Sequence, residues 1–236
     1  MRTAPQRSAR RRADGGPDEG VPGTLRAVKA PVAILAAAAL AGAAAAAAAP
    51  NPTLLHPSSL TARAPAVFRA RFVTTKGPFV VTVHRAWAPR GADRFYNLVQ
   101  ARFYDGERLF RVVPGFVVQW GISGYPSVSA AWQNADIRDD PVRHSNTRGT
   151  ISFATAGPNT RTTQVFVNVG DNASLDHEGF APFAVVTSGL AVLGRLYSGY
   201  DDTPTNAQQQ LASQGEAFVR KTFPKLDRIL TARIVH

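Results

Sequence analysis

The chain has 236 residues, of which 44% are hydrophobic and 18% are charged, so it can bury a core and is not a globally disordered protein. Its formal net charge is +11, but no run of Lys or Arg interleaved with aromatic residues follows residue 30, which argues against specific nucleic-acid binding. The absence of cysteine excludes disulfide bonds, thiol catalysis and thiolate metal sites.

Residues 1–49 have the pattern of a basic targeting leader. A stretch that contains Arg10, Arg11 and Arg12 precedes nineteen uncharged residues at 31–49, most of which are alanine. This order is typical of a secretory signal peptide, and as a helix the apolar run would be about 28 Å long, just enough to cross a bilayer. The alternatives are a cleaved signal, an uncleaved anchor, and an organelle transit sequence or mis-assigned start. We therefore expect a secreted, periplasmic or lumenal protein, or a membrane-anchored one, whose leader engages the membrane or the export machinery.

The folded domain is predicted to begin at residue 63, after a Pro- and Ser-containing linker at residues 50–62. Period-two alternation of apolar residues begins at Val67 and resumes after a Thr-Lys-Gly turn at residues 75–77, so the two runs predict a β-hairpin. Residues 91–101 carry apolar side chains at helical spacing and predict a short amphipathic helix.

The remainder of the domain, up to residue 236, is rich in short strands. Strands are predicted within residues 109–120, with an interruption at Pro114-Gly115, and then at residues 150–154, 164–169, 183–187 and 232–235. Residues 189–197 predict a second short helix, and residues 208–222 predict another helix in a polar, Gln-rich tail. Many short strands with few helices indicate a mainly β protein, built as a closed β-barrel or a sandwich.

Motifs for hydrolysis, phosphate binding and metal binding are missing from the sequence. The chain has no Gly-x-Ser-x-Gly elbow, no Gly-rich phosphate loop and no His-Glu-x-x-His pair. Its five histidines are too scattered to suggest a metal site. We therefore expect no metal ion and no other cofactor.

Two segments resemble, in order and spacing along the chain, the signature stretches of the cyclophilins, a family of peptidyl-prolyl cis-trans isomerases. They are LFRVVPGFVVQWG at residues 109–121 and RGTISFATAGPNTRTTQVFVN at residues 148–168. The tail at residues 198–227 resembles that of a bacterial-type subgroup. The resemblance implies a closed eight-stranded antiparallel β-barrel over residues 63–236, capped by two short helices, with an extra C-terminal helical segment.

The resemblance also implies a set of site residues. Arg111 occupies the position of the catalytic arginine. The proline-pocket and peptide-binding positions are Phe116, Val117, Gln119, Ala154, Thr155, Ala156, Gln164, Phe166, Leu175 and Phe180. The alternation of side chains along a strand independently supports two of these positions, because Gln164 and Phe166 are two residues apart and so share a face.

Five positions depart from the family pattern. Val117 stands in place of a methionine, Thr155 in place of an asparagine and Phe180 in place of a histidine. Ser174 replaces an aromatic residue that is important for binding cyclosporin, which implies weak sensitivity to that drug. Trp120 replaces a glycine.

By this resemblance the protein is expected to be a monomeric isomerase that rotates Xaa–Pro peptide bonds in proline-containing polypeptides and assists folding in an exported or membrane-associated setting. No specific nucleic acid is expected as a partner. The alternative is a catalytically weak peptide-binding or chaperone module on the same fold, which the altered residues Thr155 and Phe180 motivate.

Overall fold

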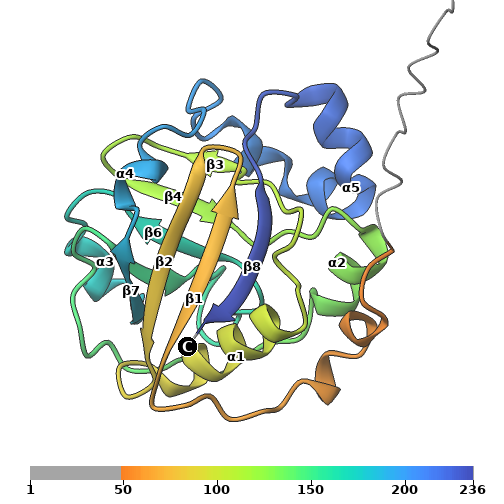
Figure 1. Cartoon of the computed structure of the whole chain (residues 1–236). Helices are drawn as coiled ribbons and strands as arrows, with labels where there is room; N and C mark the ends of the chain where they lie inside the picture. The colour runs from red at the N-terminus through yellow and green to blue at the C-terminus, as the bar shows by residue number, and fades with distance from the viewer. Residues whose placement is uncertain (1–48, 236) are drawn as a thin grey trace, which may run out of the picture. The chain divides into compact units, whose positions relative to one another are not determined.

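The computed structural model describes residues 49–235, and an eight-stranded antiparallel sheet dominates this part of the chain (Figure 1). The strands are β1 Val67–Thr74, β2 Gly77–His84, β3 Arg111–Val112, β4 Val117–Trp120, β5 Thr150–Phe153, β6 Val165–Asn168, β7 Pro182–Ser188 and β8 Ile229–Val235. Their order in the sheet is β3-β4-β6-β5-β7-β2-β1-β8. The mainly β prediction is therefore confirmed.

The predicted hairpin is present as β1 and β2. Phe68, Ala70 and Phe72 of β1 are buried while the residues between them are exposed, as period-two alternation requires. The turn at residues 75–77 sets the register, which places Phe72 directly opposite Phe79. Their rings stack with centroids 5.0 Å apart.

The sheet curls but does not close into a barrel by a continuous ladder, so this part of the prediction is wrong. The edge strands β3 and β8 are joined by an isolated antiparallel bridge between Arg108 and Arg228, which precede them, and not by a ladder of their own. Extending that register would place Val112 opposite Pro224. The pairing does not extend that far, because residues 223–226 form a turn directly after α5, in which the amide of Leu226 donates to the carbonyl oxygen of Phe223 at 3.1 Å.

Helices cover the ends and edges of the sheet. The α-helices are α1 Pro89–Gln100, α2 Pro126–Trp132, α3 Ser174–His177, α4 Leu190–Leu193 and α5 Gln208–Thr222, and the 3-10 helices are η1 Pro52–Leu55, η2 Pro57–Ser59 and η3 Thr203–Ala207. Helices α1, α4 and α5 fall where the sequence predicts them. α2 and α3 were not predicted, because seven and four residues are too few to display a helical period.

The core is filled by aromatic residues from strands and helices. Phe72 and Phe79 pack against Trp120, with ring centroids 5.7 and 6.3 Å from it, and Phe95 of α1 packs against Phe183 of β7 at 5.0 Å. All five side chains are buried. Trp120, which departs from the family pattern, therefore serves as a central core residue.

The segment that was predicted as a linker lies against the folded domain. Leu54 is buried, and its carbonyl oxygen accepts a hydrogen bond of 2.8 Å from Nε1 of Trp132. Asn97 of α1 binds the backbone of Ala62 twice, since its Oδ1 accepts from the amide N at 3.0 Å and its Nδ2 donates to the carbonyl O at 2.7 Å. Asn51 Nδ2 donates to the carbonyl oxygen of Ala101. Residues 50–62 are therefore attached to α1 and α2 by specific contacts.

The leader at residues 1–49 lies outside the described residues, apart from Ala49. Within residues 49–235, no helix combines the length and the hydrophobicity needed to span a membrane.

Helix α5 is bent at Gly215, and the bend lets it dock against the loop before α2. Gly215 has φ 60° and ψ −146°, and a Cβ atom there would lie 2.2 Å from the carbonyl oxygen of Gly124. Directly after the bend, the amide of Glu216 donates to that same carbonyl at 3.0 Å. Only glycine fits both the conformation and the close approach.

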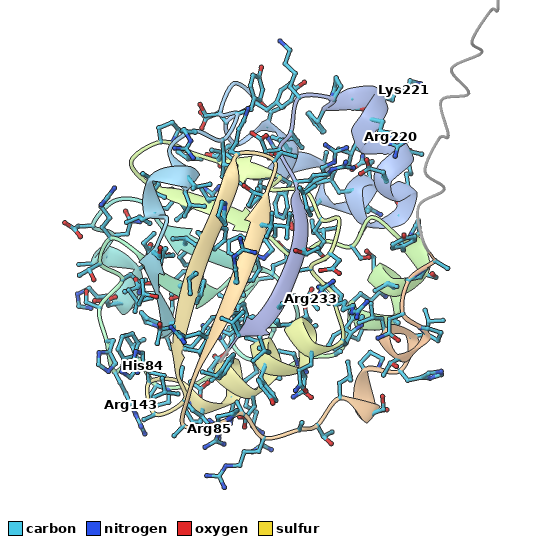
Figure 2. The ribbon with its side chains drawn as sticks, viewed as in Figure 1. His84, Arg85, Arg143, Arg220, Lys221 and Arg233 are labelled. Atoms are coloured by element: carbon cyan, nitrogen blue, oxygen red, sulfur yellow. The ribbon has the colours of Figure 1, made fainter. Side chains whose placement is uncertain are left out.

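The basic residues lie on different parts of the surface, and several are neutralised. Figure 2 shows Arg85 at one end of the strands, Arg220 on α5 and Arg233 on β8. Arg85 pairs with Asp93 and Arg233 with Asp105, both at 2.7 Å. This distribution agrees with the interpretation of the charge as a general basic surface.

Candidate functional site

Most of the predicted site residues converge on one groove. A cavity of about 200 Å³ is lined by Arg111, Phe116, Val117, Gln119, Ala154, Thr155, Phe166, Leu175, Phe180, Thr205 and Gln208. Nine of the eleven residues predicted from sequence are among them. Gln164 lines an adjoining cavity of about 260 Å³ and reaches the groove through a hydrogen bond. Ala156 is exposed and does not line the groove.

The register of the strands brings the central residues together. Arg111 of β3 lies opposite Gln119 of β4, which in turn lies opposite Phe166 of β6. Residues directly opposite each other in antiparallel strands leave the sheet on the same face. The three side chains therefore form one row across the sheet, although up to 55 residues separate them in sequence.

Gly121 permits the close approach of β4 and β6 at the end of this row. Its φ is +117°, and a Cβ atom there would lie 2.5 Å from Cα of Gln164 and 2.5 Å from the carbonyl oxygen of Thr163. A larger residue would push the chain at Gln164 away.

One half of the groove is an apolar slot. Val117, Phe166 and Leu175 are buried at its base, and Phe116, Ala154 and Phe180 pack around them as partly exposed walls. The Phe166 and Phe180 rings meet edge to face, with centroids 5.4 Å apart and an interplanar angle of 75°. Phe180 thus completes the slot at the position where the family pattern has histidine.

The loop that carries Leu175 and Phe180 is held by Asp176. Its carboxylate accepts hydrogen bonds from the amide and Nδ2 of Asn146, at 2.8 and 2.7 Å, and from Oγ of Ser145. Burial on its own would raise the pKa of Asp176, but these hydrogen bonds lower the pKa below its ordinary value. The ionised side chain therefore fixes one wall of the slot.

The other half of the groove is polar and contains Arg111. Its Nη1 donates to Oε1 of Gln119 at 3.4 Å, and its guanidinium carbon lies 5.2 Å from the centre of the Phe116 ring. Nε of Arg111 pairs with Oδ1 of Asp202. An amide, a ring and a carboxylate therefore surround the guanidinium.

A chain of amide side chains continues from Gln119. Its Nε2 donates to Oε1 of Gln164 at 2.9 Å, and Nε2 of Gln164 donates to Oε1 of Gln208 at 3.0 Å. Gln208 is the first residue of α5, so the chain joins the sheet to the C-terminal helix.

Thr155 is directed into its own loop. Its hydroxyl interacts with the Thr160 hydroxyl at 2.9 Å and accepts from the amide of Gly157 at 3.0 Å. The side chain is thus engaged within residues 155–160, so its contribution to a bound peptide would come from the backbone.

Sequence reasoning missed three residues around the groove. Asp202, Thr205 and Gln208 belong to the polar segment before and at the start of α5. Thr205 Oγ1 is buried and has no hydrogen-bond partner within the described part of the chain. The polar, Gln-rich composition was the only signal, and it does not indicate that this segment folds back over β3.

No group of three His, Asp or Glu side chains converges within residues 49–235 in a way that could hold a metal ion. The groove offers a cation, amides and an apolar slot. This arrangement can bind a peptide segment and donate hydrogen bonds to it.

Comparisons with known proteins agree on one family. A family model described as "Cyclophilin type peptidyl-prolyl cis-trans isomerase/CLD" matches residues 69–214. Peptidyl-prolyl cis-trans isomerase A of Dickeya dadantii is 35% identical over 152 residues, which cover 58% of this chain and 78% of the relative. A peptidyl-prolyl cis-trans isomerase of Schizosaccharomyces pombe is 32% identical over 126 residues, covering 52% and 81%.

The fold also resembles that of a solved structure. A crystal structure of a cyclophilin-type peptidyl-prolyl cis-trans isomerase from Cryptosporidium parvum matches with a TM-score of 0.52, covering 72% of this chain and 98% of that one. The sequence identity is 17%, so this likeness concerns the fold alone.

Proposed function

The chain belongs to the cyclophilin-type peptidyl-prolyl cis-trans isomerase family, and on this premise we propose that it catalyses rotation about Xaa–Pro peptide bonds. The observation that carries the proposal is the position of Arg111 at the polar edge of an apolar slot based on Phe166. The substrates are proline-containing polypeptides.

The reaction requires a group that binds the twisted imide better than either planar form. Rotation about a peptide bond costs about 18–20 kcal/mol because the nitrogen electrons are delocalised in the planar state. In the twisted transition state the proline nitrogen regains a lone pair and can accept a hydrogen bond. A donor that interacts only with this state raises the rate constant.

Arg111 supplies that donor. A charged hydrogen bond contributes about 1.5–3 kcal/mol, which corresponds to roughly a ten- to hundred-fold change in rate. The guanidinium lies beside the slot, 5.2 Å from the Phe116 ring centre, and its terminal amino groups can reach a ring held there. The mechanism needs neither a nucleophile nor a proton transfer.

The other groups bind the peptide. The slot formed by Val117, Phe166 and Leu175 removes the proline ring from water, and Gln119 and Gln164 hold the peptide carbonyl groups on either side. Holding both ends while one bond turns lowers the entropic cost of reaching the twisted geometry.

A catalytically weak peptide-binding or chaperone module is the second candidate. Two observations favour it: the Arg111 Nε is already engaged by Asp202, and the Thr155 hydroxyl is engaged within its own loop. Exchange spectroscopy by NMR on an Xaa–Pro peptide separates the two functions. Binding without faster cis/trans exchange would support the second candidate.

We further propose that the protein acts as a monomer in an exported or membrane-associated setting. The basic and Ala-rich leader at residues 1–49 supports this setting. The domain organisation proposed is this leader, the segment at 50–62 and the isomerase domain at 63–236. Membership of the bacterial-type subgroup stays a prediction.

The decisive test is a proline-isomerisation assay on the full chain and on Arg111→Ala. Wild type should accelerate cis/trans exchange of a standard Xaa–Pro peptide, and Arg111→Ala should lower kcat/KM roughly ten- to hundred-fold. Arg69→Ala is the matched control, because it removes the same charge from the exposed face of β1. Full activity in Arg111→Ala would overturn the proposed mechanism.

A further inference from the structure

The segment that leads into α5 forms an additional wall of the groove. Helix η3 lies against β3, and the segment places Asp202 on Arg111, Thr205 in the groove lining and Gln208 on Gln164. These are three polar side chains within seven residues. Thr205 and Gln208 line the groove, and Asp202 contacts one of its lining residues.

The contact between Asp202 and Arg111 involves one particular donor. The carboxylate takes the Nε–H, which leaves both terminal amino groups of the guanidinium for other partners, and Nη1 contacts Gln119. Asp202 does not line the groove, so it does not occupy the space of a substrate. It contacts the arginine from outside the slot.

The wall that carries Asp202 is itself anchored. The Tyr200 ring packs edge to face against Tyr197 and Phe223, with centroids 5.0 and 5.2 Å apart. Pro204 is buried, and the amide of Thr205 donates to the carbonyl oxygen of Asp202 at 2.9 Å. A carboxylate held on such a base can restrict the side chain it binds.

We propose that Asp202 is a positioning residue that fixes the guanidinium of Arg111 for the isomerase reaction. This inference rests on the proposed function of the groove. An arginine has many rotamers, and a donor that is already oriented loses less freedom when the twisted imide forms. Because the benefit appears in the transition state, its loss lowers kcat and leaves KM nearly unchanged.

The kinetic test compares variants of Asp202 with a neighbouring control in the full chain. Asp202→Ala should lower kcat about tenfold with KM within about twofold, and Asp202→Asn, which keeps an acceptor for Nε–H, should retain part of the rate. Asp201→Asn is the control, because Asp201 is the adjacent exposed acid and asparagine tolerates its φ of 48°. It should leave both constants unchanged.

A double-mutant cycle distinguishes positioning from a structural role. In an Arg111→Ala background, Asp202→Ala should have no further effect, because the residue acts only through the arginine. An equal loss in both backgrounds would overturn the inference, as would an increase in kcat/KM, which would make the contact inhibitory. An active wild type with unaffected Asp202 variants would leave the proposed function standing without this inference.

A measurement that does not use activity completes the test. The Nε–H resonance of Arg111, assigned through its loss in Arg111→Lys, should exchange slowly with solvent in wild type and at least several-fold faster in Asp202→Ala. Unchanged exchange would overturn the inference even if the wild type shows no isomerase activity.

Discussion

Gln119 and Phe166 lie directly opposite each other on β4 and β6, so the polar and apolar halves of the groove adjoin along a single pair of strands. Both side chains are buried. A small shift of either strand would therefore change the position of the Gln119 amide and of the apolar slot together.

Phe166→Ala should weaken substrate binding. The ring forms the base of the slot, and burial of a phenylalanine side chain contributes about 1.5–3 kcal/mol, so kcat/KM should fall roughly ten- to hundred-fold, mainly through KM. Steady-state kinetics with a short Xaa–Pro peptide measures this. Phe166→Leu keeps an apolar base, so its kcat/KM should fall much less than that of Phe166→Ala. Equal losses of kcat/KM in the two variants would argue against a slot for the proline ring.

The rate of isomerisation should be nearly flat from about pH 6 to 9 and insensitive to a chelator, because an arginine stays charged over this range and no proton is transferred. The measurement is kcat/KM across the range, with and without EDTA. A bell-shaped profile would indicate general acid–base catalysis instead.

Glu107 should make the stability of the protein depend on pH. Its side chain is buried, and no side-chain group within the described residues donates a hydrogen bond to either carboxyl oxygen. Burial, opposed by the backbone amide of Gly121 and assisted by the charge of Asp105, raises the pKa of Glu107 well above the ordinary value of 4.5. Folding therefore favours the protonated form of Glu107. The stability that this group contributes to the folded state is fully present below its ordinary pKa and is lost as the pH rises through its raised pKa.

Glu107→Gln tests this dependence, since it removes the charge and keeps the shape. Between the ordinary and the raised pKa of Glu107, the free energy of unfolding of wild type should fall by up to about 1.4 kcal/mol per pH unit, and that of the variant should fall less. Denaturant unfolding at several pH values measures the difference. Glu178→Gln, at an exposed position, is the control and should follow wild type.

The segment at residues 50–62 should stabilise the domain. Asn97→Ala removes both hydrogen bonds to the Ala62 backbone and should lower the free energy of unfolding by about 1–3 kcal/mol. A chain that begins at residue 63 should be less stable than one that begins at residue 50, because it also loses the buried Leu54. Thermal unfolding checks both, with exposed Asn206→Ala as the control. Equal stability of the two chains would show that residues 50–62 act as a linker and do not stabilise the domain.

Local patterns predicted much of the fold. The alternation of Phe68, Ala70 and Phe72 fixed the buried face of β1, since side chains of a strand alternate regardless of its partners. Nine site residues identified by resemblance line one groove. The open edge between β3 and β8 was not predictable, because it depends on a turn at residues 223–226 that meets β3 only through contacts between distant residues.

The strand pattern, the absence of cysteine and the two motif segments can be identified from the sequence, because each depends on residue types at short separation. The contact of Asp202 with Arg111 across 91 residues, and the docking of residues 50–62 on α1 and α2, are visible only in the folded chain. Neither the segment around Asp202 nor residues 50–62 has a periodic pattern that reveals its partner. Such polar contacts form only after the core has brought distant parts of the chain together.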